Sequence, residues 1–170
     1  IKSSAASDVY KRQAFATTGT GGFSTKQASV SYYNSPYIEY VISIFMFISG
    51  INFTLLLLFV NRKFKKFISN AELKFYFGSV VLFTAVIAIV LYYTSPMGME
   101  ESFRKSLFQV ISLQTSTGFA TDDYMQWTPV LWGLLTIIML MGACAGSTTG
   151  GLKCIRCLLY TSPSPRDPKT

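Results

Sequence analysis

The 170-residue chain contains no histidine and only three cysteines, and it has 8 Asp and Glu against 15 Lys and Arg. The absence of histidine removes the commonest metal ligand of proteins and the usual general base of enzymes. Three cysteines give no basis for a disulfide framework. We find no nucleophile–base pair and no cluster of metal ligands. The sequence therefore argues against an enzyme, and we expect no cofactor.

The two ends of the chain can encode each other's complementary strand. Permitted codons for Ser3–Gln13 include AGATGTGTATAAGAGACA, which is the reverse complement of TGTCTCTTATACACATCT, a permitted reading within Cys157–Asp167. We interpret residues 1–13 and 157–170 as a sequencing adapter read in frame, and Ala14–Arg156 as an internal fragment of a natural protein. The alternative is a disordered tail rich in Ser and Pro.

Charge within Ala14–Arg156 is modest, with ten basic and six acidic residues and hence a net charge of +4. The basic residues do not form the stripe that a nucleic-acid partner requires, so we expect no nucleic acid to bind. Half of them instead lie between two apolar segments: Arg62, Lys63, Lys65, Lys66 and Lys74.

Those two apolar segments have the length of membrane crossings. Residues 36–60 contain a single acid, Glu39, and residues 73–94 form the second segment. A helix that rises about 1.5 Å per residue crosses a hydrocarbon core of roughly 30 Å in about 20 residues. Basic residues concentrate on the cytoplasmic side. We therefore expect a multi-pass, all-α membrane protein surrounded by lipid, with residues 61–70 as a cytoplasmic loop.

Two short glycine-containing passages nearly repeat each other. Residues 21–25 read GGFST and residues 117–121 read TGFAT, 96 positions later, and each precedes an apolar segment. Glycine reaches positive φ without steric cost, which suits a backbone that exposes its carbonyls. Rings of such carbonyls replace the hydration shell of a cation. The repetition predicts two filter segments, at 17–25 and 116–121, both on the outer side.

Residues 101–116 are too polar to cross a membrane, although their apolar residues recur near a helical period. They form either an amphipathic helix on the surface or a pore helix that enters from outside. Because they run directly into the second glycine passage, we favour the pore helix, whose carbonyl end would face a bound cation. Ala14 and Phe15 would then be the last turn of an equivalent helix.

The third apolar run, residues 128–141, is short of the roughly 20 residues that span a bilayer. Ten small residues follow it, at 142–151. The passage is not a phosphate loop, since Leu152 separates Gly151 from Lys153 and no strand precedes it. An ordinary turn between helices is possible. We favour a membrane helix over 128–156 that is broken at 142–151, where its loop would obstruct a permeation path.

These residues together resemble the Trk/Ktr/HKT superfamily of potassium-uptake transporters. The resemblance lies in Thr-Gly-Gly-Phe-Ser-Thr at 20–25, Asn-Ser-Pro at 34–36, Ser-Gly-Ile-Asn-Phe-Thr at 49–54, Ser-Thr-Gly-Phe-Ala-Thr-Asp at 116–122, and residues 142–153. It covers essentially all of Ala14–Arg156. The family fold that it implies consists of four helix–pore loop–helix repeats around one pseudo-fourfold pore.

The resemblance implies a role for each motif. Residues 14–70 would end the second repeat, and residues 71–156 would form most of the third. Backbone carbonyls would coordinate K⁺, the transported ion, at Thr20, Gly21, Gly22, Phe23, Ser116, Thr117, Gly118 and Phe119. The gate would comprise Gly142, Gly146, Ser147, Thr148, Gly150, Gly151 and Lys153.

The resemblance also implies partners and leaves alternatives. The pore subunits of the family form homodimers, and a cytoplasmic nucleotide-binding subunit regulates them, in the bacterial inner membrane. A sodium-permeable member of the same superfamily remains an alternative. So does a secondary transporter that binds a solute at broken helices, although no charged residue lies in the middle of these segments.

Several further residues have two interpretations. Asn52 and Thr54 fall mid-helix, where we favour bonds between helices over contact with substrate. Asp122 and Asp123 either concentrate cations at the outer mouth or cap the next helix. We expect Arg104 and Lys105 to extend toward the outer interface.

Overall fold

The computed structural model describes residues 11, 13–24, 29–33, 35–95, 98–123 and 126–154. Most of the two terminal segments interpreted as adapter sequence lies outside the described residues, as do Thr25 of the expected filter and residues 155–156 of the expected broken helix. Residues 13–18 are helical. The remaining elements are η1 (Ser29–Tyr33), α2 (Pro36–Ser49), α3 (Phe53–Val60), α4 (Phe64–Ile68), α5 (Ala71–Thr94), α6 (Met99–Gln114) and α7 (Pro129–Leu140).

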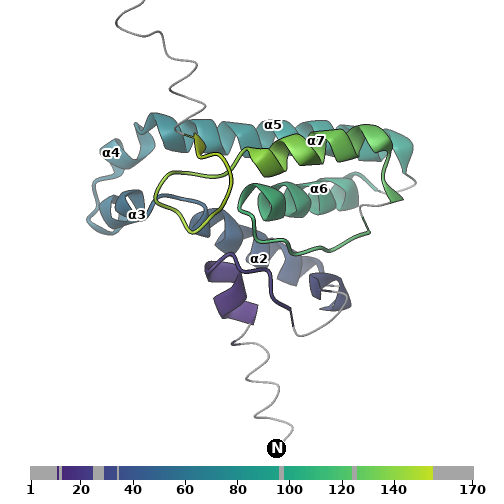
Figure 1. The fold of residues 1–170 in the computed structure, drawn as a ribbon, viewed down its shortest axis with the longest axis horizontal. Helices are drawn as coiled ribbons and strands as arrows, with labels where there is room; N and C mark the ends of the chain where they lie inside the picture. Colours follow the sequence, from purple (N-terminus) through teal and green to yellow (C-terminus); the bar gives the residue numbers. More distant parts are fainter. Residues whose placement is uncertain are drawn as a thin grey trace, which may run out of the picture.

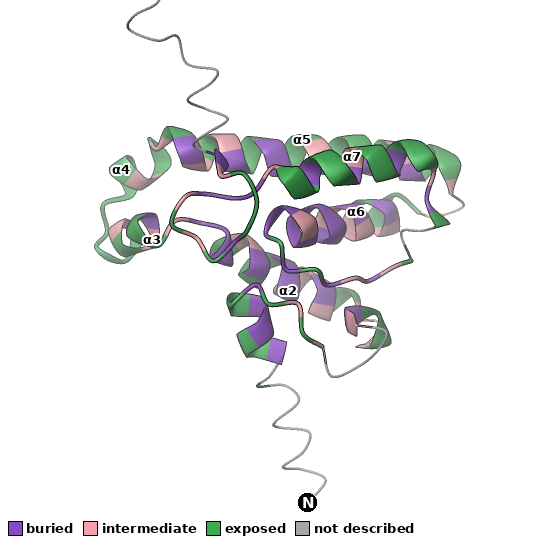
Figure 2. Ribbon diagram, viewed as in Figure 1, coloured by how far each residue is buried: buried purple, intermediate pink, exposed green. Residues whose placement is uncertain are grey.

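The architecture is all-α, and its most polar long helix occupies the middle (Figure 1). Helix α6 packs against α2, α5 and α7. Half of its 16 residues are buried, among them Ser102, Ser106 and Ser112. In the most apolar window of α5, by contrast, only 33% of the residues are buried. Figure 2 shows the same contrast between a buried α6 and an exposed α5 and α7. Residues 99–114 therefore form a buried helix and not an amphipathic helix on the surface.

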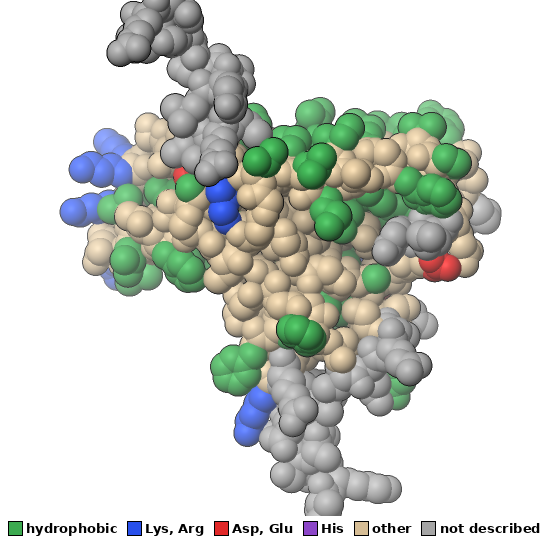
Figure 3. Space-filling view, in the orientation of Figure 1, with side chains coloured by type: hydrophobic (Ala, Val, Ile, Leu, Met, Phe, Trp, Pro, Cys, Tyr) green, Lys and Arg blue, Asp and Glu red, His purple; other side chains and the backbone are tan. Residues whose placement is uncertain are grey.

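Apolar side chains cover much of the surface of the molecule. Such a surface is suited to contact with lipid or with other membrane helices. On α5 the exposed fractions of Phe77, Leu82 and Ile89 are 58%, 61% and 57%. Figure 3 shows such side chains spread over the α5–α7 side of the molecule, whereas several basic side chains lie together at the α3–α4 end. By length and composition, one described helix, α5, can cross a membrane, or two if the bent pair α2–α3 counts as one span.

The expectation of one continuous helix over residues 36–60 is wrong. The chain bends by 103° between α2 and α3. A Cβ atom on Gly50 would lie 2.4 Å from the Tyr76 hydroxyl oxygen, so α2 ends where only glycine fits against α5. The Asn52 side chain then accepts a hydrogen bond from Thr54 N at 2.8 Å and starts α3 as an N-cap. The sequence favours a hydrogen bond from Asn52 to another helix, but in the structure its side chain caps the start of α3.

Other boundaries differ by small amounts, for local reasons. Helix α5 begins at Ala71 rather than at 73, because Asn70 Oδ1 accepts from the backbone N–H groups of Glu72 and Leu73 at 2.9 and 3.2 Å. Helix α6 extends over 99–114 rather than 101–116. The expected cytoplasmic loop 61–70 contains the short helix α4.

Two apolar clusters hold these helices together. One surrounds the fully buried side chains of Met46, Tyr76 and Phe108, where α2, α5 and α6 meet. The second lies between α5, α6 and α7 and includes Ile87, Val110, Trp127, Leu131, Leu135 and Ile138. Residues of α6 contribute to both clusters. Packing against α2, α5 and α7 therefore fixes the position of α6 and of the segment that follows it.

Candidate ion-permeation site

Two segments carry the predicted filter: residues 20–23, here the first glycine segment, and residues 116–119, the second glycine segment. Each follows a helical end that closes with the same hydrogen bonds. Gly21 N donates to Ala16 O at 2.9 Å, as Thr117 N donates to Ser112 O at 2.9 Å. Thr20 N donates to Thr17 O, as Ser116 N donates to Leu113 O. This pair of bonds is the Schellman motif. The sequence repeat is therefore also a repeat of backbone structure.

Backbone angles repeat in the same register. The φ angles of Thr20 and Ser116 are 49° and 55°, and those of Gly22 and Gly118 are 66° and 78°. Glycine adopts this left-handed region freely, whereas a residue with a Cβ atom loses about 1–2 kcal/mol there. Thr20 and Ser116 occupy the Schellman position that glycine usually takes. Strain at a non-glycine residue is thus present at the same place in both repeats.

The two glycine segments touch each other. A Cβ atom on Gly22 would lie 1.9 Å from the carbonyl oxygen of Thr117 and 3.7 Å from the Gly118 Cα atom. A Cβ atom on Gly118, by contrast, would have no neighbour within 4 Å among the described residues. Gly22 therefore supplies the close contact between the segments, and Gly118 borders open space.

The phenylalanines of the two segments differ. Phe119 is 1% exposed, and its carbonyl oxygen accepts a hydrogen bond from Ser112 Oγ at 2.6 Å. Phe23 is 81% exposed. The hydroxyl groups of Thr115 and Thr117 lie 2.8 Å apart beside the second segment. The second segment is thus anchored to α6, while the Phe23 ring has no such packing within the described part of the chain.

The 142–151 loop lies directly against both segments (Figure 1, between α3 and the end of α6). The Thr20 hydroxyl donates to Thr148 O at 3.1 Å. A Cβ atom on Gly150 would lie 3.4 Å from Ser116 Oγ. The loop therefore contacts the first residue of each glycine segment.

Hydrogen bonds within the loop give it a defined shape. Its base is closed by Gly142 N donating to Leu152 O at 2.8 Å and by Leu152 N donating to Leu140 O at 3.0 Å. Ser147 Oγ lies 2.7 Å from Thr149 Oγ1. The Lys153 ammonium donates to the carbonyl and hydroxyl oxygens of Thr149. Of the predicted gate residues, Lys153 and Ser147 thus shape the loop, while Thr148 and Gly150 contact the glycine segments.

The other side of the loop rests on the α2–α3 bend and on α5. Cys144 N donates to Gly50 O, and Phe53 N donates to Gly146 O, both at 3.2 Å. A carboxylate oxygen of Glu72 accepts a hydrogen bond from Ala145 N. Sequence reasoning missed Glu72 as a site residue. The available signal was an acid in the first turn of a membrane-length helix.

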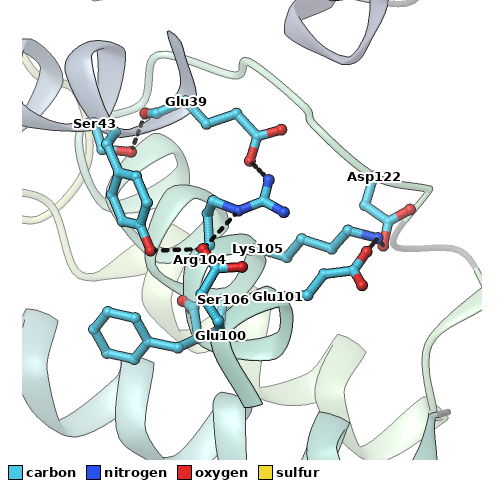
Figure 4. A network of polar contacts seen from close by, with 10 residues as sticks. Glu39, Ser43, Glu100, Glu101, Arg104, Lys105, Ser106 and Asp122 are labelled. Carbon is cyan, nitrogen blue, oxygen red and sulfur yellow. Dashed lines mark hydrogen bonds and ion pairs between the residues drawn. The ribbon is translucent and has the colours of Figure 1, made fainter. Parts of the chain in front are cut away.

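A network of charged side chains lies near the start of α6 (Figure 4). Arg104 pairs with Glu39 of α2 and with Glu100, to which its Nε atom is 3.2 Å distant. Lys105 pairs with Glu101 at 3.0 Å and with Asp122 at 3.1 Å. The side chains of Arg104 and Lys105 are only 11% and 15% exposed, and both are held in ion pairs. Their extension toward the outer interface stays a prediction.

Asp122, which follows the second glycine segment, forms an ion pair with Lys105 in α6. The N-cap residue of α7 is Thr128. The helix-capping interpretation of Asp122 is thus wrong. Glu39 and Asp122 together connect α2 and the end of the segment to two consecutive residues of α6.

Comparisons with known proteins find a family of cation transport proteins and several potassium uptake proteins that are similar to this chain. The model of the TrkH family, described as "Cation transport protein", matches residues 12–167. This range extends into both segments interpreted as adapter sequence, and that interpretation stays a prediction. The chain is 37% identical over 157 residues to the Trk system potassium uptake protein TrkH of Escherichia coli K12, covering 91% of this chain and 32% of that protein. It is 34% identical over 155 residues to TrkG of the same organism, covering 89% and 31%.

A solved structure gives the same result in three dimensions. The crystal structure of the potassium transporter TrkH from Vibrio parahaemolyticus superimposes with a TM-score of 0.81 at 36% identity, covering 86% of this chain and 32% of that one. The chain thus spans about a third of the length of the relatives that it matches.

Proposed function

The chain belongs to the TrkH family of cation transport proteins, and on this premise we propose that it forms part of the permeation path of a potassium-uptake transporter. It is an all-α protein of a bacterial cell membrane, and among its described helices α5 is long and apolar enough to cross that membrane. Its characterised relatives are transport proteins rather than enzymes by name. Potassium is the cargo, and the proposal includes no cofactor.

One observation carries the proposal: the two glycine segments share one backbone conformation and meet at Gly22 and Thr117. Repeats around a common axis bring equivalent segments together at that axis. Glycine at position 22 lets the two main chains approach closely, as a narrow carbonyl-lined passage requires.

We assign ion coordination to the carbonyls of residues 20–22 and 116–118. Gly118 borders open space, and the C-terminal end of α6, with its partial negative charge, precedes the second segment. Phe119 was predicted as a coordinating residue, but its carbonyl accepts from Ser112 Oγ. We therefore assign Phe119 to anchoring the segment. Two segments of a pseudo-fourfold ring supply half of its ligands.

We assign gating to the 142–151 loop. Its contacts with Thr20 and near Ser116 support a position directly beside the filter. Irregular backbone at membrane depth is tolerated where protein satisfies its polar groups, and the loop is bonded at its base and on both sides. Displacement of the loop would then widen the path without altering the carbonyls that select the ion.

We extend the proposal to two partners on the resemblance alone. The full-length protein would form a homodimer, and a cytoplasmic nucleotide-binding subunit would regulate it.

The test of the proposed function is rubidium uptake by the full-length protein in vesicles, with rubidium as the potassium probe. We expect uptake that potassium inhibits more strongly than sodium does. Equal inhibition by both ions would favour a sodium-permeable member of the family. Absence of rubidium uptake, in protein that is folded by size-exclusion chromatography, would contradict the proposal.

A further inference from the structure

Glu72 lies outside the proposed ion path, yet its side chain reaches the 142–151 loop. It is the second residue of α5 and is 8% exposed. Within the described part of the chain, no Lys or Arg lies within ion-pairing distance of its carboxylate. The carboxylate instead accepts a hydrogen bond from the backbone N–H of Ala145, in the middle of the loop.

The chemistry of this contact makes it stronger than an ordinary loop hydrogen bond. A hydrogen bond to an ionised carboxylate is roughly twice as strong as one between neutral groups. The N-terminus of α5, with its partial positive charge, stabilises the carboxylate from the other side. If the loop moved away, a buried charge would lose its partner. Glu72 therefore favours the loop position that the structure shows.

The loop is bonded at four consecutive residues on this side. The contacts are Cys154 N to Ala143 O at 3.1 Å, Cys144 N to Gly50 O at 3.2 Å, Ala145 N to Glu72, and Phe53 N to Gly146 O at 3.2 Å. Three of these join backbone to backbone. The contact of Ala145 is the one among the four in which a side chain takes part, and a substitution can remove it while leaving the backbone unchanged.

We propose that Glu72 is a positioning residue that holds the 142–151 loop in its obstructing place beside the filter. The inference rests on the proposed function of that loop. On the opposite side the loop has the weaker, neutral contact between Thr20 and Thr148. Loss of the Glu72 contact therefore weakens the attachment of the loop on the side of α5, where three backbone hydrogen bonds remain, and leaves the glycine segments in place.

The experiment compares rubidium and sodium flux of the full-length protein, in vesicles, for Glu72→Ala, Glu72→Gln and a deletion of residues 147–150. Glu101→Ala is the matched control, because it removes a partly exposed carboxylate from another helix. A second readout is the reaction rate of Cys144, which is buried in the loop, in a background whose other cysteines are Ser. Glutamine keeps an acceptor oxygen, so Glu72→Gln is the conservative rescue.

We expect Glu72→Ala to raise rubidium flux and Cys144 reactivity about tenfold, the order that loss of one hydrogen bond to a charged group gives. The ratio of rubidium to sodium flux should not change. The rubidium flux of Glu72→Gln should lie between those of Glu72→Ala and the wild type, and that of Glu101→Ala should match the wild type.

Unchanged rubidium flux and unchanged Cys144 reactivity in Glu72→Ala, together with faster flux in the loop deletion, would overturn the role of Glu72 alone. A loop deletion without faster flux would overturn the proposed gate itself. If Glu72→Ala does not fold, the same comparison is decided by Glu72→Gln.

Discussion

Gly22 lies against the carbonyl oxygen of Thr117, so closely that a Cβ atom at residue 22 would stand 1.9 Å from it. Residues so far apart in the sequence meet here because each belongs to one copy of the same structural repeat. Both glycines of the repeat have left-handed backbone, but only Gly22 is also crowded. The two equivalent positions should therefore differ in how they tolerate a side chain.

Alanine substitutions test this difference. Gly118→Ala adds a Cβ atom in open space and introduces only the left-handed strain, about 1–2 kcal/mol. Gly22→Ala adds a clash with the second segment, which raises the loss by a further ~1–3 kcal/mol. We expect both variants to lower the preference for rubidium over sodium, and Gly22→Ala to be the less stable in thermal unfolding in detergent. Equal stability of the two variants would show that the segments do not touch.

Glycine substitutions at the preceding left-handed residues test the strain and the contact with the loop. Ser116→Gly relieves the left-handed strain at an exposed residue, so we expect it to stabilise the protein by up to about 1 kcal/mol. Thr20→Gly relieves the same strain but also loses the hydrogen bond to Thr148 O, worth about 1 kcal/mol. The difference in melting temperature between the two variants measures that bond. A larger gain for Thr20→Gly than for Ser116→Gly would contradict the contact.

The pair of Arg104 and Glu39 should matter for stability more than the other ion pairs. Both side chains are about a tenth exposed, and removal of one partner from a buried pair costs about 3–5 kcal/mol. We expect Arg104→Ala to lower the melting temperature strongly, and the double variant with Glu39→Ala to recover part of the loss. Glu101→Ala is the control, since its pair is more exposed and is worth less than about 1 kcal/mol. An equally mild effect of Arg104→Ala would mean that the pair is solvated.

Labelling with a membrane-impermeant maleimide tests the orientation. The basic segment that includes Lys65 is expected on the cytoplasmic side. We expect Lys65→Cys to react only in inside-out vesicles, and Tyr32→Cys, at a 58% exposed residue of η1, to react from outside in intact cells. Reaction of both residues from the same side would remove the basis for placing the glycine segments at the outer end of the path.

The sequence predicted the features that depend on local pattern. Hydropathy located α5 to within two residues, and the repeat of Gly22 and Gly118 predicted two equivalent segments. Left-handed φ angles at Thr20 and Ser116 had no such signal, because neither residue type demands that conformation.

Features that depend on tertiary contacts were not predictable in the same way. The bend at Gly50 arises where α2 meets Tyr76 of α5, and an apolar run of 25 residues contains no sign of that neighbour. The partner of Glu72 is a backbone N–H on a loop 73 positions away, which no side-chain pattern encodes. The ion pair between Glu39 of α2 and Arg104 of α6 could not be predicted either, because the two residues are distant in the sequence and meet only in the folded structure.

The most direct test of the central claim is the position of bound rubidium in a crystal of the full-length protein, located by its anomalous scattering. The account predicts a rubidium peak within coordinating distance of carbonyl oxygens from both residues 20–22 and residues 116–118. A peak held by side chains elsewhere in the membrane region, with no rubidium between the two glycine segments, would contradict it.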